Sequence, residues 1–253
     1  MSQDWRALAQ QVQLPSQLFI DGKFVAPKSG KYFPSINPAK AEQIAEIAEA
    51  GQADVDLAVQ AGRRAYEKTW SRLSGKERGK YLFRIARIMQ ERSRELAVVE
   101  TLDGGKPIKE SRDFDLPMVA AHFFYYAGWA DKLKYAFPGK TPQPLGVAGQ
   151  IIPWNFPLLM AAWKIAPALA CGNTVVLKPA SQTPFSSLAL AQMLVDECGL
   201  PADHLQVVTG GGSTVGNAIV DHPDVALITF TGSPDVGWAI RARWPRRAAP
   251  RRG

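Results

Sequence analysis

The sequence predicts an α/β protein whose core is a doubly wound parallel sheet, preceded by a helical amino-terminal region. Two patterns support this fold class. From residue 51 to residue 145 apolar residues recur at helical spacing, and from residue 146 short β-branched runs alternate with helix signals. Such alternation is typical of parallel strands joined by crossover helices. A chain of 253 residues is long enough to bury a substantial core in this arrangement.

Residues 1–50 predict an amino-terminal arm and hairpin. Two short apolar runs, Leu18 to Ile20 and Lys23 to Val25, flank an Asp-Gly pair, which favours a tight hairpin turn. Asn37 and Pro38 mark a second turn, before the apolar stretch from Ile44 to Ile47.

Residues 51–145 form the predicted helical region. A helix begins after Ser74, because Ser74 and Glu77 have the spacing of a capping box, in which each side chain bonds the other residue's backbone amide. Apolar spacing predicts three more helices, at 53–69, 94–102 and 115–132.

Residues 146–243 contain the predicted parallel sheet. Thr183 followed by Pro184 predicts a helix N-cap and first helical residue, and Gly199 predicts the end of that helix. Four runs rich in β-branched residues predict the strands: Val147 to Ile152, Thr174 to Lys178, Leu205 to Val208 and Val225 to Phe230.

The formal net charge of +7 is concentrated at one end of the chain. Residues 241–253 hold six arginines and no acidic residue, so the rest of the chain is nearly neutral and predicts no nucleic-acid partner. We assign 244–253 to an aberrant Arg-rich tail. Such a tail can bind nucleic acid through nonspecific phosphate contacts. Its mixture of Arg, Ala and Pro also fits a shifted reading frame in GC-rich DNA, which we favour.

Other functional classes have little support in the sequence. No apolar run is long enough for a membrane helix, and the first residues lack the basic and apolar regions of a signal peptide, so we expect a cytoplasmic protein without membrane contact. Cys171 and Cys198 show neither disulfide nor metal spacing, and both are expected to be buried, inert thiols. The three histidines, His122, His204 and His222, are scattered and predict no metal site.

The run from Val225 to Gly237 predicts a strand, a glycine turn and a helix start. This geometry directs backbone N–H groups and the positive end of a helix dipole at an anion. A glycine turn can equally serve only to connect two elements, so this run alone leaves both interpretations open.

Three segments resemble the aldehyde dehydrogenase superfamily. They are G-V-A-G-Q-I-I-P-W-N-F-P from Gly146, V-V-L-K-P-A-S-Q-T-P from Val175 and F-T-G-S from Phe230. The resemblance implies an aldehyde dehydrogenase-like fold with a Rossmann-like NAD(P)-binding segment over 146–243. It also implies the family reaction, in which an aldehyde, water and NAD(P)⁺ give a carboxylic acid and NAD(P)H.

The resemblance assigns the F-T-G-S turn to the cofactor pyrophosphate, the lysine after the second strand to the adenosine ribose, and a glycine-rich loop to the adenine. On general grounds Lys178 could instead be a solvated residue at a strand end, and the glycine-rich loop could be only a flexible connection. Ile152 and Trp154, which the resemblance places along the cofactor cleft, could likewise be core residues. The expected cofactor-binding residues are Ile152, Trp154, Lys178, Ser181, Gly212, Gly216, Phe230, Thr231, Gly232 and Ser233.

Asn155 is the expected catalytic residue. In the family, this asparagine amide and the backbone N–H of the nucleophilic cysteine form an oxyanion hole. On the local sequence alone Asn155 could also be a helix N-cap before Phe156 and Pro157.

Ser181 bears on the choice between NAD and NADP. Many NAD-dependent family members carry a glutamate at this position, whose carboxylate accepts from the ribose 2′-OH. Since Ser181 would repel a 2′-phosphate less, we hypothesise that NADP is tolerated.

The family motifs that carry the nucleophile and the general base, G-Q-x-C and E-L-G-G, do not occur in the sequence. We therefore expect the amino-terminal, cofactor-binding half of a family member, truncated before the catalytic cysteine and inactive alone. The alternative is a non-catalytic nucleotide-binding or scaffolding protein. The aldehyde would be a partner only of an intact parent enzyme. Because Tyr135 to Pro144 is short and rich in proline, pairing through the family's arm at this place is not expected, and oligomerisation of the parent stays open.

Overall fold

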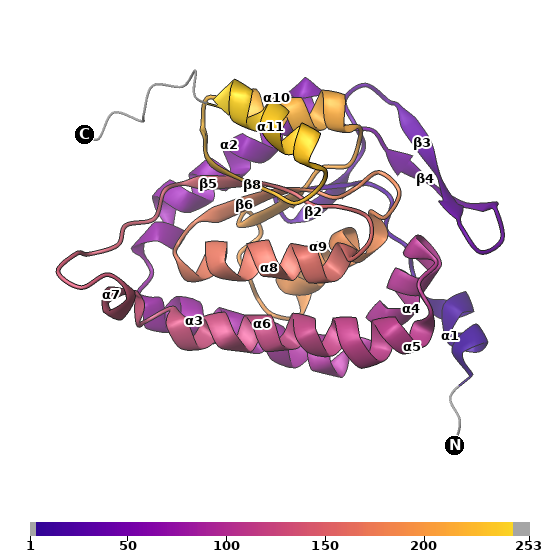
Figure 1. Cartoon of the computed structure of the whole chain (residues 1–253), viewed down its shortest axis with the longest axis horizontal. Helices are drawn as coiled ribbons and strands as arrows, with labels where there is room; N and C mark the ends of the chain where they lie inside the picture. The colour runs from indigo at the N-terminus through magenta and orange to yellow at the C-terminus, as the bar shows by residue number, and fades with distance from the viewer. Residues whose placement is uncertain (1–3, 245–253) are drawn as a thin grey trace.

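A six-stranded sheet forms the centre of the molecule in the computed structural model, which describes residues 4–244 (Figure 1). The strand order is β2-β1-β7-β6-β5-β8. The last four strands of this order run parallel, and β1 runs antiparallel to β7. The strands of the sheet are β1 (Leu18–Ile20), β2 (Lys23–Val25), β5 (Val147–Ile151), β6 (Thr174–Lys178), β7 (Leu205–Val207) and β8 (Val225–Phe230).

The predicted fold class is confirmed, and so are all four parallel strands. The bounds of β6 and β8 agree to the residue, while β5 and β7 each end one residue earlier than expected. The predicted hairpin is also present, but it is part of the sheet, because Phe19 of β1 pairs with Val207 of β7. The first fifty residues thus share the main sheet with the rest of the chain, and the domain boundary at residue 50 stays a prediction.

A second antiparallel pair lies outside the main sheet. It is made of β3 (Tyr32–Asn37) and β4 (Glu42–Ala48), joined by the turn that follows Asn37. The sequence indicated this turn and the apolar stretch in β4, whereas β3 was not anticipated. Its burial alternates only weakly, so its pattern does not stand out in the sequence.

Helices cover both faces of the sheet, as expected for a doubly wound fold (Figure 1). On one face lie α2, α10 and α11. On the other lie α8 and α9, with α3 and α6 forming a further layer over α8. The helices are α1 (Trp5–Gln11), α2 (Gln52–Lys68), α3 (Gly75–Glu91), α4 (Ser93–Gly104), α5 (Ile108–Glu110), α6 (Leu116–Trp129), α7 (Leu133–Ala136), α8 (Pro157–Ala170), α9 (Phe185–Asp196), α10 (Asn217–Asp221) and α11 (Pro234–Arg243). Single 3-10 or π-helical turns are η1 (Trp70–Arg72), η2 (Ser111–Asp115) and η3 (Gly212–Gly216).

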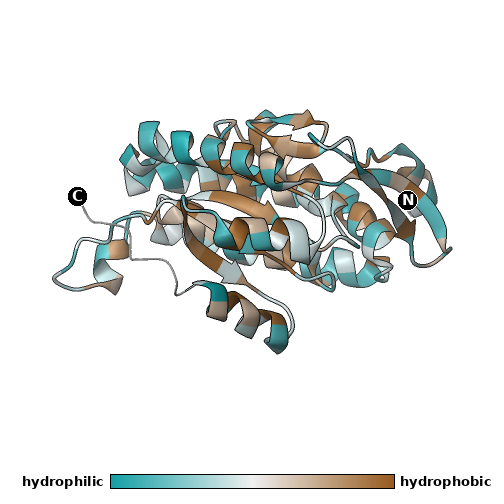
Figure 2. Cartoon of the chain, turned by 90° about the horizontal axis from the view of Figure 1, so that it is seen from above, coloured by the Kyte–Doolittle hydropathy of each residue, from teal (hydrophilic) through white to brown (hydrophobic). Residues whose placement is uncertain are grey.

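The hydrophobic core is divided by the sheet into two halves. Successive strand residues point to opposite faces, so Val175 packs with the core beneath α8 and α9, while Val176 packs with the core beneath α2 and α10. Figure 2 shows the resulting hydrophobic band along the central strands. All five residues of β5 and of β6 are buried, as expected for central parallel strands that are covered on both faces.

The helical layer is held by a close approach of α3 to the end of α6. The predicted capping box at Ser74 and Glu77 is present and starts α3. A methyl group on Gly75 would lie 2.1 Å from the Ala130 carbonyl oxygen, so only glycine fits here. The buried Trp70 adds a tie to α8, because its indole N–H donates to the Leu169 carbonyl at 3.1 Å.

The N-terminus of α9 is capped from another helix, and the predicted N-cap role of Thr183 is wrong. The helix begins at Phe185 with Pro184 in the N-cap position, and the Thr183 hydroxyl caps nothing. Instead the Phe185 N–H donates to the carboxyl of Asp103, on α4, at 2.9 Å. Because Asp103 is distant in sequence, the cap could not be found from the local sequence.

No helix within residues 4–244 has the length and apolar composition of a membrane span.

Replacing Asp103 with alanine should leave the buried Phe185 N–H without its acceptor. We expect D103A to lower the free energy of unfolding by about 1–3 kcal/mol, measured by urea denaturation with circular dichroism. D103N is the matched control, because it retains a carbonyl oxygen of the same shape and should lose less than half as much. Equal losses in the two variants would contradict the capping role.

Candidate functional site

The site forms where the winding direction of the sheet reverses. The chain passes from β5 to β6 to β7 on one side and then returns to place β8 on the other side of β5. The carboxyl ends of β5 and β8 therefore meet, with Ile151 in register with Phe230 and with Lys178 of β6. In open α/β sheets, ligands bind outside the carboxyl ends of the strands at such a reversal. The topology thus brings the predicted site segments to one edge.

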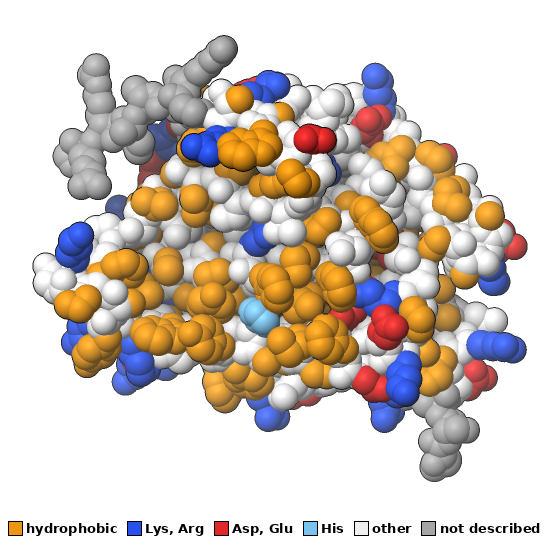
Figure 3. All heavy atoms as spheres, in the orientation of Figure 1, with side chains coloured by type: hydrophobic (Ala, Val, Ile, Leu, Met, Phe, Trp, Pro, Cys, Tyr) orange, Lys and Arg blue, Asp and Glu red, His pale blue; other side chains and the backbone are white. Residues whose placement is uncertain are grey.

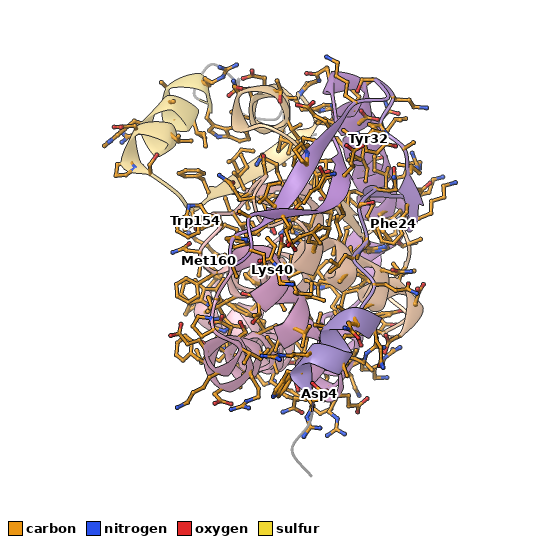
Figure 4. All side chains as sticks on the ribbon, turned by 90° about the vertical axis from the view of Figure 1, so that its right-hand side faces the viewer. Asp4, Phe24, Tyr32, Lys40, Trp154 and Met160 are labelled. Carbon is orange, nitrogen blue, oxygen red and sulfur yellow. The ribbon has the colours of Figure 1, made fainter. Side chains whose placement is uncertain are left out.

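The segment after β5 carries Ile152, Trp154 and Asn155. Ile152 is buried, and its N–H donates to the Lys178 carbonyl at 3.2 Å, which ties this segment to β6. Trp154 is 59% exposed, so the alternative of a core tryptophan is wrong. Figure 4 shows it at the margin of the molecule. The alternative that Asn155 caps α8 is also wrong: Phe156 holds the N-cap position without a side-chain bond, and Asn155 is exposed. Its amide therefore remains available to a ligand.

Lys178 is buried, which overturns the alternative of a solvated lysine. Its ammonium group donates to the Pro179 carbonyl at 2.7 Å, and desolvation lowers its pKa to about 8. Gly216 lies against it, since a methyl group there would lie 3.8 Å from Lys178 Cδ. The lysine stem thus packs beside Gly216 of the predicted adenine loop, while the ammonium group is held at Pro179.

The glycine-rich loop after β7 packs against the segment after β6. The Ser181 hydroxyl donates to the Gly210 carbonyl at 3.0 Å. Gly212 begins the π-helical turn η3, where a side chain would meet open space, and Gly216 ends it. The loop is therefore fixed at Gly210 and Gly216, while Gly212 faces outward.

The turn after β8 is compact around an aromatic ring. The Thr231 N–H donates to the Ile151 carbonyl at 3.1 Å, which continues the β5 pairing. A methyl group on Gly232 would lie 2.5 Å from Phe230 Cζ, so the ring and the turn are in close contact. Phe230 thus shapes the turn from within, and a side chain at position 232 would displace the ring or the turn.

The structure adds Lys164 of α8 to this turn. Its ammonium group donates to the Thr231 hydroxyl at 2.5 Å, and burial lowers its pKa. Sequence reasoning missed this residue. The available signal was a single charged residue within the apolar run of α8.

The start of α11 fits an anion. Ser233 is its N-cap, and the serine hydroxyl accepts from the Val236 N–H at 3.5 Å, a long contact that leaves this hydroxyl available to another group. The first-turn N–H groups and the helix dipole add positive potential at this end. Asp235 in the first turn opposes it. A pyrophosphate is compatible with this combination of a glycine turn, a hydroxyl and a helix N-terminus.

A buried cluster of charged residues lies behind Asn155. This cluster was not identified from the sequence. Lys106 places its ammonium group 2.5 Å from a carboxyl oxygen of Asp115 and 3.9 Å from one of Glu100. A cavity of about 180 Å³ lies between this cluster and the Asn155 segment. Burial raises the pKa of Glu100 to about 8, and the charge of Asp115 adds to the rise, although Lys106 and the Leu158 amide oppose it. Glu100 lies one helical turn after Leu96 and Ala97, on the apolar face of the predicted helix, and this position was the signal that could have found the cluster.

The cysteines and histidines lie away from this edge. Cys198 is buried and desolvation raises its pKa to about 12, while the half-buried Cys171 follows α8 and burial raises its pKa too. His204 and His222 are buried, and His122 stacks against Trp163. Within the described part of the chain, no group of His, Cys, Asp or Glu side chains is arranged to hold a metal ion.

Comparison with known families decides the identity of this arrangement. The model of the aldehyde dehydrogenase family matches residues 24–250. The chain belongs to the aldehyde dehydrogenase family. The matched range includes most of the Arg-rich tail, which lies outside the described residues apart from Trp244, so its assignment as aberrant stays a prediction.

Curated relatives in this family are similar over most of the chain. A mitochondrial aldehyde dehydrogenase, family 2 member B4, from Arabidopsis thaliana is 47% identical over 234 residues, which are 89% of this chain and 43% of the relative. Human retinal dehydrogenase 2 is 45% identical over 236 residues, covering 89% of this chain and 45% of the relative. The chain thus spans about half the length of the curated relatives it matches.

Solved aldehyde dehydrogenases share the fold. An indole-3-acetaldehyde dehydrogenase in complex with NAD⁺ superimposes with a TM-score of 0.91 at 38% identity, over 96% of this chain and 51% of that structure. A putative aldehyde dehydrogenase from Burkholderia cenocepacia gives 0.86 at 43% identity, over 91% and 48% respectively. Members of the family bind a nicotinamide cofactor, as the NAD⁺ complex illustrates.

The raised pKa of Glu100 should make stability depend on pH. In the folded protein Glu100 keeps its proton up to about pH 8, whereas in the unfolded chain it loses it near the ordinary value of 4.5. Because the folded state then binds one more proton at this group, Glu100 alone should lower the free energy of unfolding by at most about 1.4 kcal/mol per pH unit as the pH rises from 5 to 8. Urea titrations at several pH values measure this slope.

The E100Q variant isolates the contribution of Glu100 to that slope. Burial also raises the pKa of Asp103, which adds a slope of the same sign in both proteins. Since glutamine does not titrate, E100Q should show the flatter pH dependence. An unchanged slope would mean that Glu100 is already ionised in the folded protein.

Proposed function

We propose that this chain is the cofactor-binding portion of an NAD(P)-dependent aldehyde dehydrogenase. The whole enzyme converts an aldehyde, water and NAD(P)⁺ to a carboxylic acid and NAD(P)H. The observation that carries the proposal is the convergence of Asn155, Lys178 and the turn from Thr231 to Ser233 on one edge of the sheet. The relatives bound to NAD⁺ in solved structures support the same reading.

Each group has a chemical task in this proposal. The bound nicotinamide accepts hydride from the substrate. The Asn155 amide donates a hydrogen bond to the carbonyl oxygen as negative charge develops on it. Ser233 and the first turn of α11 bind the pyrophosphate, and Lys178 donates to the adenosine ribose. Trp154 borders the cleft, and Ile152 forms its buried wall. We propose that this portion binds cofactor by itself without oxidising aldehyde.

The proposal also covers the second phosphate of NADP. Ser181 brings no charge to the ribose side of the site and holds its hydroxyl on the Gly210 carbonyl. The family resemblance places one positive charge, the ammonium group of Lys178, at the adenosine ribose. A 2′-phosphate would meet this ammonium group rather than a carboxylate, so both NAD and NADP are accepted.

Cofactor titration of the chain tests the proposed function directly. The purified chain should bind NAD⁺ in a calorimetric titration. G232A should bind at least about tenfold more weakly, because the added methyl group displaces the Phe230 ring or the turn, at a cost of about 1–3 kcal/mol. Gly128, where a methyl group meets nothing within 4 Å, gives the control variant G128A, which should bind like the original chain. Absence of NAD⁺ and NADP⁺ binding by the folded chain would refute the proposal and favour a scaffolding role.

The NADP preference should respond to both charge and pH. S181E places a carboxylate at the ribose and should weaken NADP binding at least about tenfold while leaving NAD binding within about twofold, whereas S181A should leave the ratio nearly unchanged. In the original chain, the affinity for NADP relative to NAD should fall as the pH rises through about 8, since Lys178 loses its charge there. Titrations at pH 7 and pH 9 measure the ratio. Tighter NADP binding by S181E would contradict the assignment of Ser181.

A further inference from the structure

Glu100, Lys106 and Asp115 form a nearly solvent-free cluster behind the Asn155 segment. Their side chains are 1%, 13% and 1% exposed. They come from three places: Glu100 from α4, Lys106 from the connection after α4, and Asp115 from the turn before α6. The cavity of about 180 Å³ has Glu100 and Lys106 on one wall and Trp154, Asn155 and Pro157 on the other. The cluster and the proposed oxyanion residue therefore share one small space.

The charges in this cluster balance when Glu100 holds its proton. Lys106 and Asp115 form the close ion pair, and Glu100 lies farther from the ammonium group. Neither carboxyl oxygen of Glu100 has a hydrogen-bond partner of normal geometry among the described residues. Burying two carboxylates with one ammonium would leave an uncompensated charge, which is strongly disfavoured in a dry site. The ammonium group of Lys106 is thus held by Asp115 and is not shared equally between Asp115 and Glu100.

From this position Lys106 contacts the segment that carries Asn155. Its ammonium group lies 3.9 Å from the centre of the Phe156 ring, within the range of a cation–π interaction. Phe156 follows Asn155 directly and precedes the first residue of α8. At the other end of the segment, the Ile152 N–H is bonded to the Lys178 carbonyl. The segment is therefore anchored on both sides of Asn155, while Asn155 itself is exposed.

We propose that Lys106, held by Asp115, is a positioning residue that fixes the backbone of Asn155 through the Phe156 ring. The proposal rests on the proposed function, since only there does the Asn155 amide act on a substrate carbonyl. Displacement of such a donor by about 1 Å is enough to weaken transition-state stabilisation, so an anchor next to it has a direct chemical consequence. The cavity beside the anchor leaves the segment few other contacts that could replace it.

Backbone dynamics of Asn155 test the proposal in the full chain. Labelling with ¹⁵N-asparagine gives four backbone signals, from Asn37, Asn155, Asn173 and Asn217, and an N155S variant assigns the one of interest. Asn173 is an internal reference, because it is buried and its side chain accepts from the Leu145 and Gly146 N–H groups. NMR order parameters then report on each position separately.

Two variants remove the anchor in different ways. K106M D115N removes the ion pair without leaving an unpaired charge, and F156L removes the ring while the ion pair stays intact. In both, the order parameter of Asn155 should fall from about 0.85 to below about 0.6 while that of Asn173 is unchanged. K106R keeps the charge over the ring and should retain the order. K109M, at an exposed lysine three residues away, is the matched control and should change nothing.

The outcomes separate this proposal from the proposed function. An Asn155 amide that stays rigid in folded K106M D115N or F156L overturns the positioning role, even if the variants unfold at lower urea. Equal loss of order at Asn173 would also overturn it, because the effect would then be general. NAD⁺ titrations of the same samples address the proposed function: failure of the original chain to bind refutes that function, whatever the Asn155 signal shows.

Discussion

Pairing along β5 determines where every candidate site residue lies. This strand is bonded to β6 on one side and to β8 on the other, so Lys178 and Phe230 both lie beside Ile151. A shift of one residue in either pairing would turn the buried side chains of a strand to the opposite face, which the two-sided core does not allow. The apolar packing above and below the sheet therefore fixes the register. The register in turn sets the distance between the Asn155 segment and the turn at Gly232.

Buried acids of α4 support the site from behind. Asp103 caps α9, and Glu100 lies against the first turn of α8 beside the cluster of Lys106 and Asp115. Both crossover helices that flank β6 thus depend on one helix outside the sheet. The polar groups in these contacts are nearly shielded from water. A hydrogen bond or ion pair with good geometry is electrostatically stronger there than at the surface.

Local sequence was sufficient for the four parallel strands, the hairpin of β1 and β2 and the starts of several long helices, because β-branched runs, a capping box and glycine turns act over a few residues. It did not reveal β3. It located the segments of Asn155, Lys178 and Ser233, and the family resemblance gave them roles. It failed where a contact joins distant parts of the chain. The capping of α9 by Asp103, the burial of Lys178 and the bond from Lys164 to Thr231 all depend on tertiary packing. For that reason the predicted N-cap role of Thr183 and the alternative of a solvated Lys178 were wrong.

The two sides of the cofactor edge differ in how firmly the sheet holds them. The strand β6 lies between two neighbours and is wholly buried, whereas β8 pairs only with β5 among the described residues and is mostly half-buried. Strands with one partner open more readily than central strands. The end of β6, which carries Lys178, is therefore the more rigid side of the edge, and the glycine turn after β8 is the more flexible side. The edge therefore opens first at the glycine turn, while the end of β6 keeps its shape.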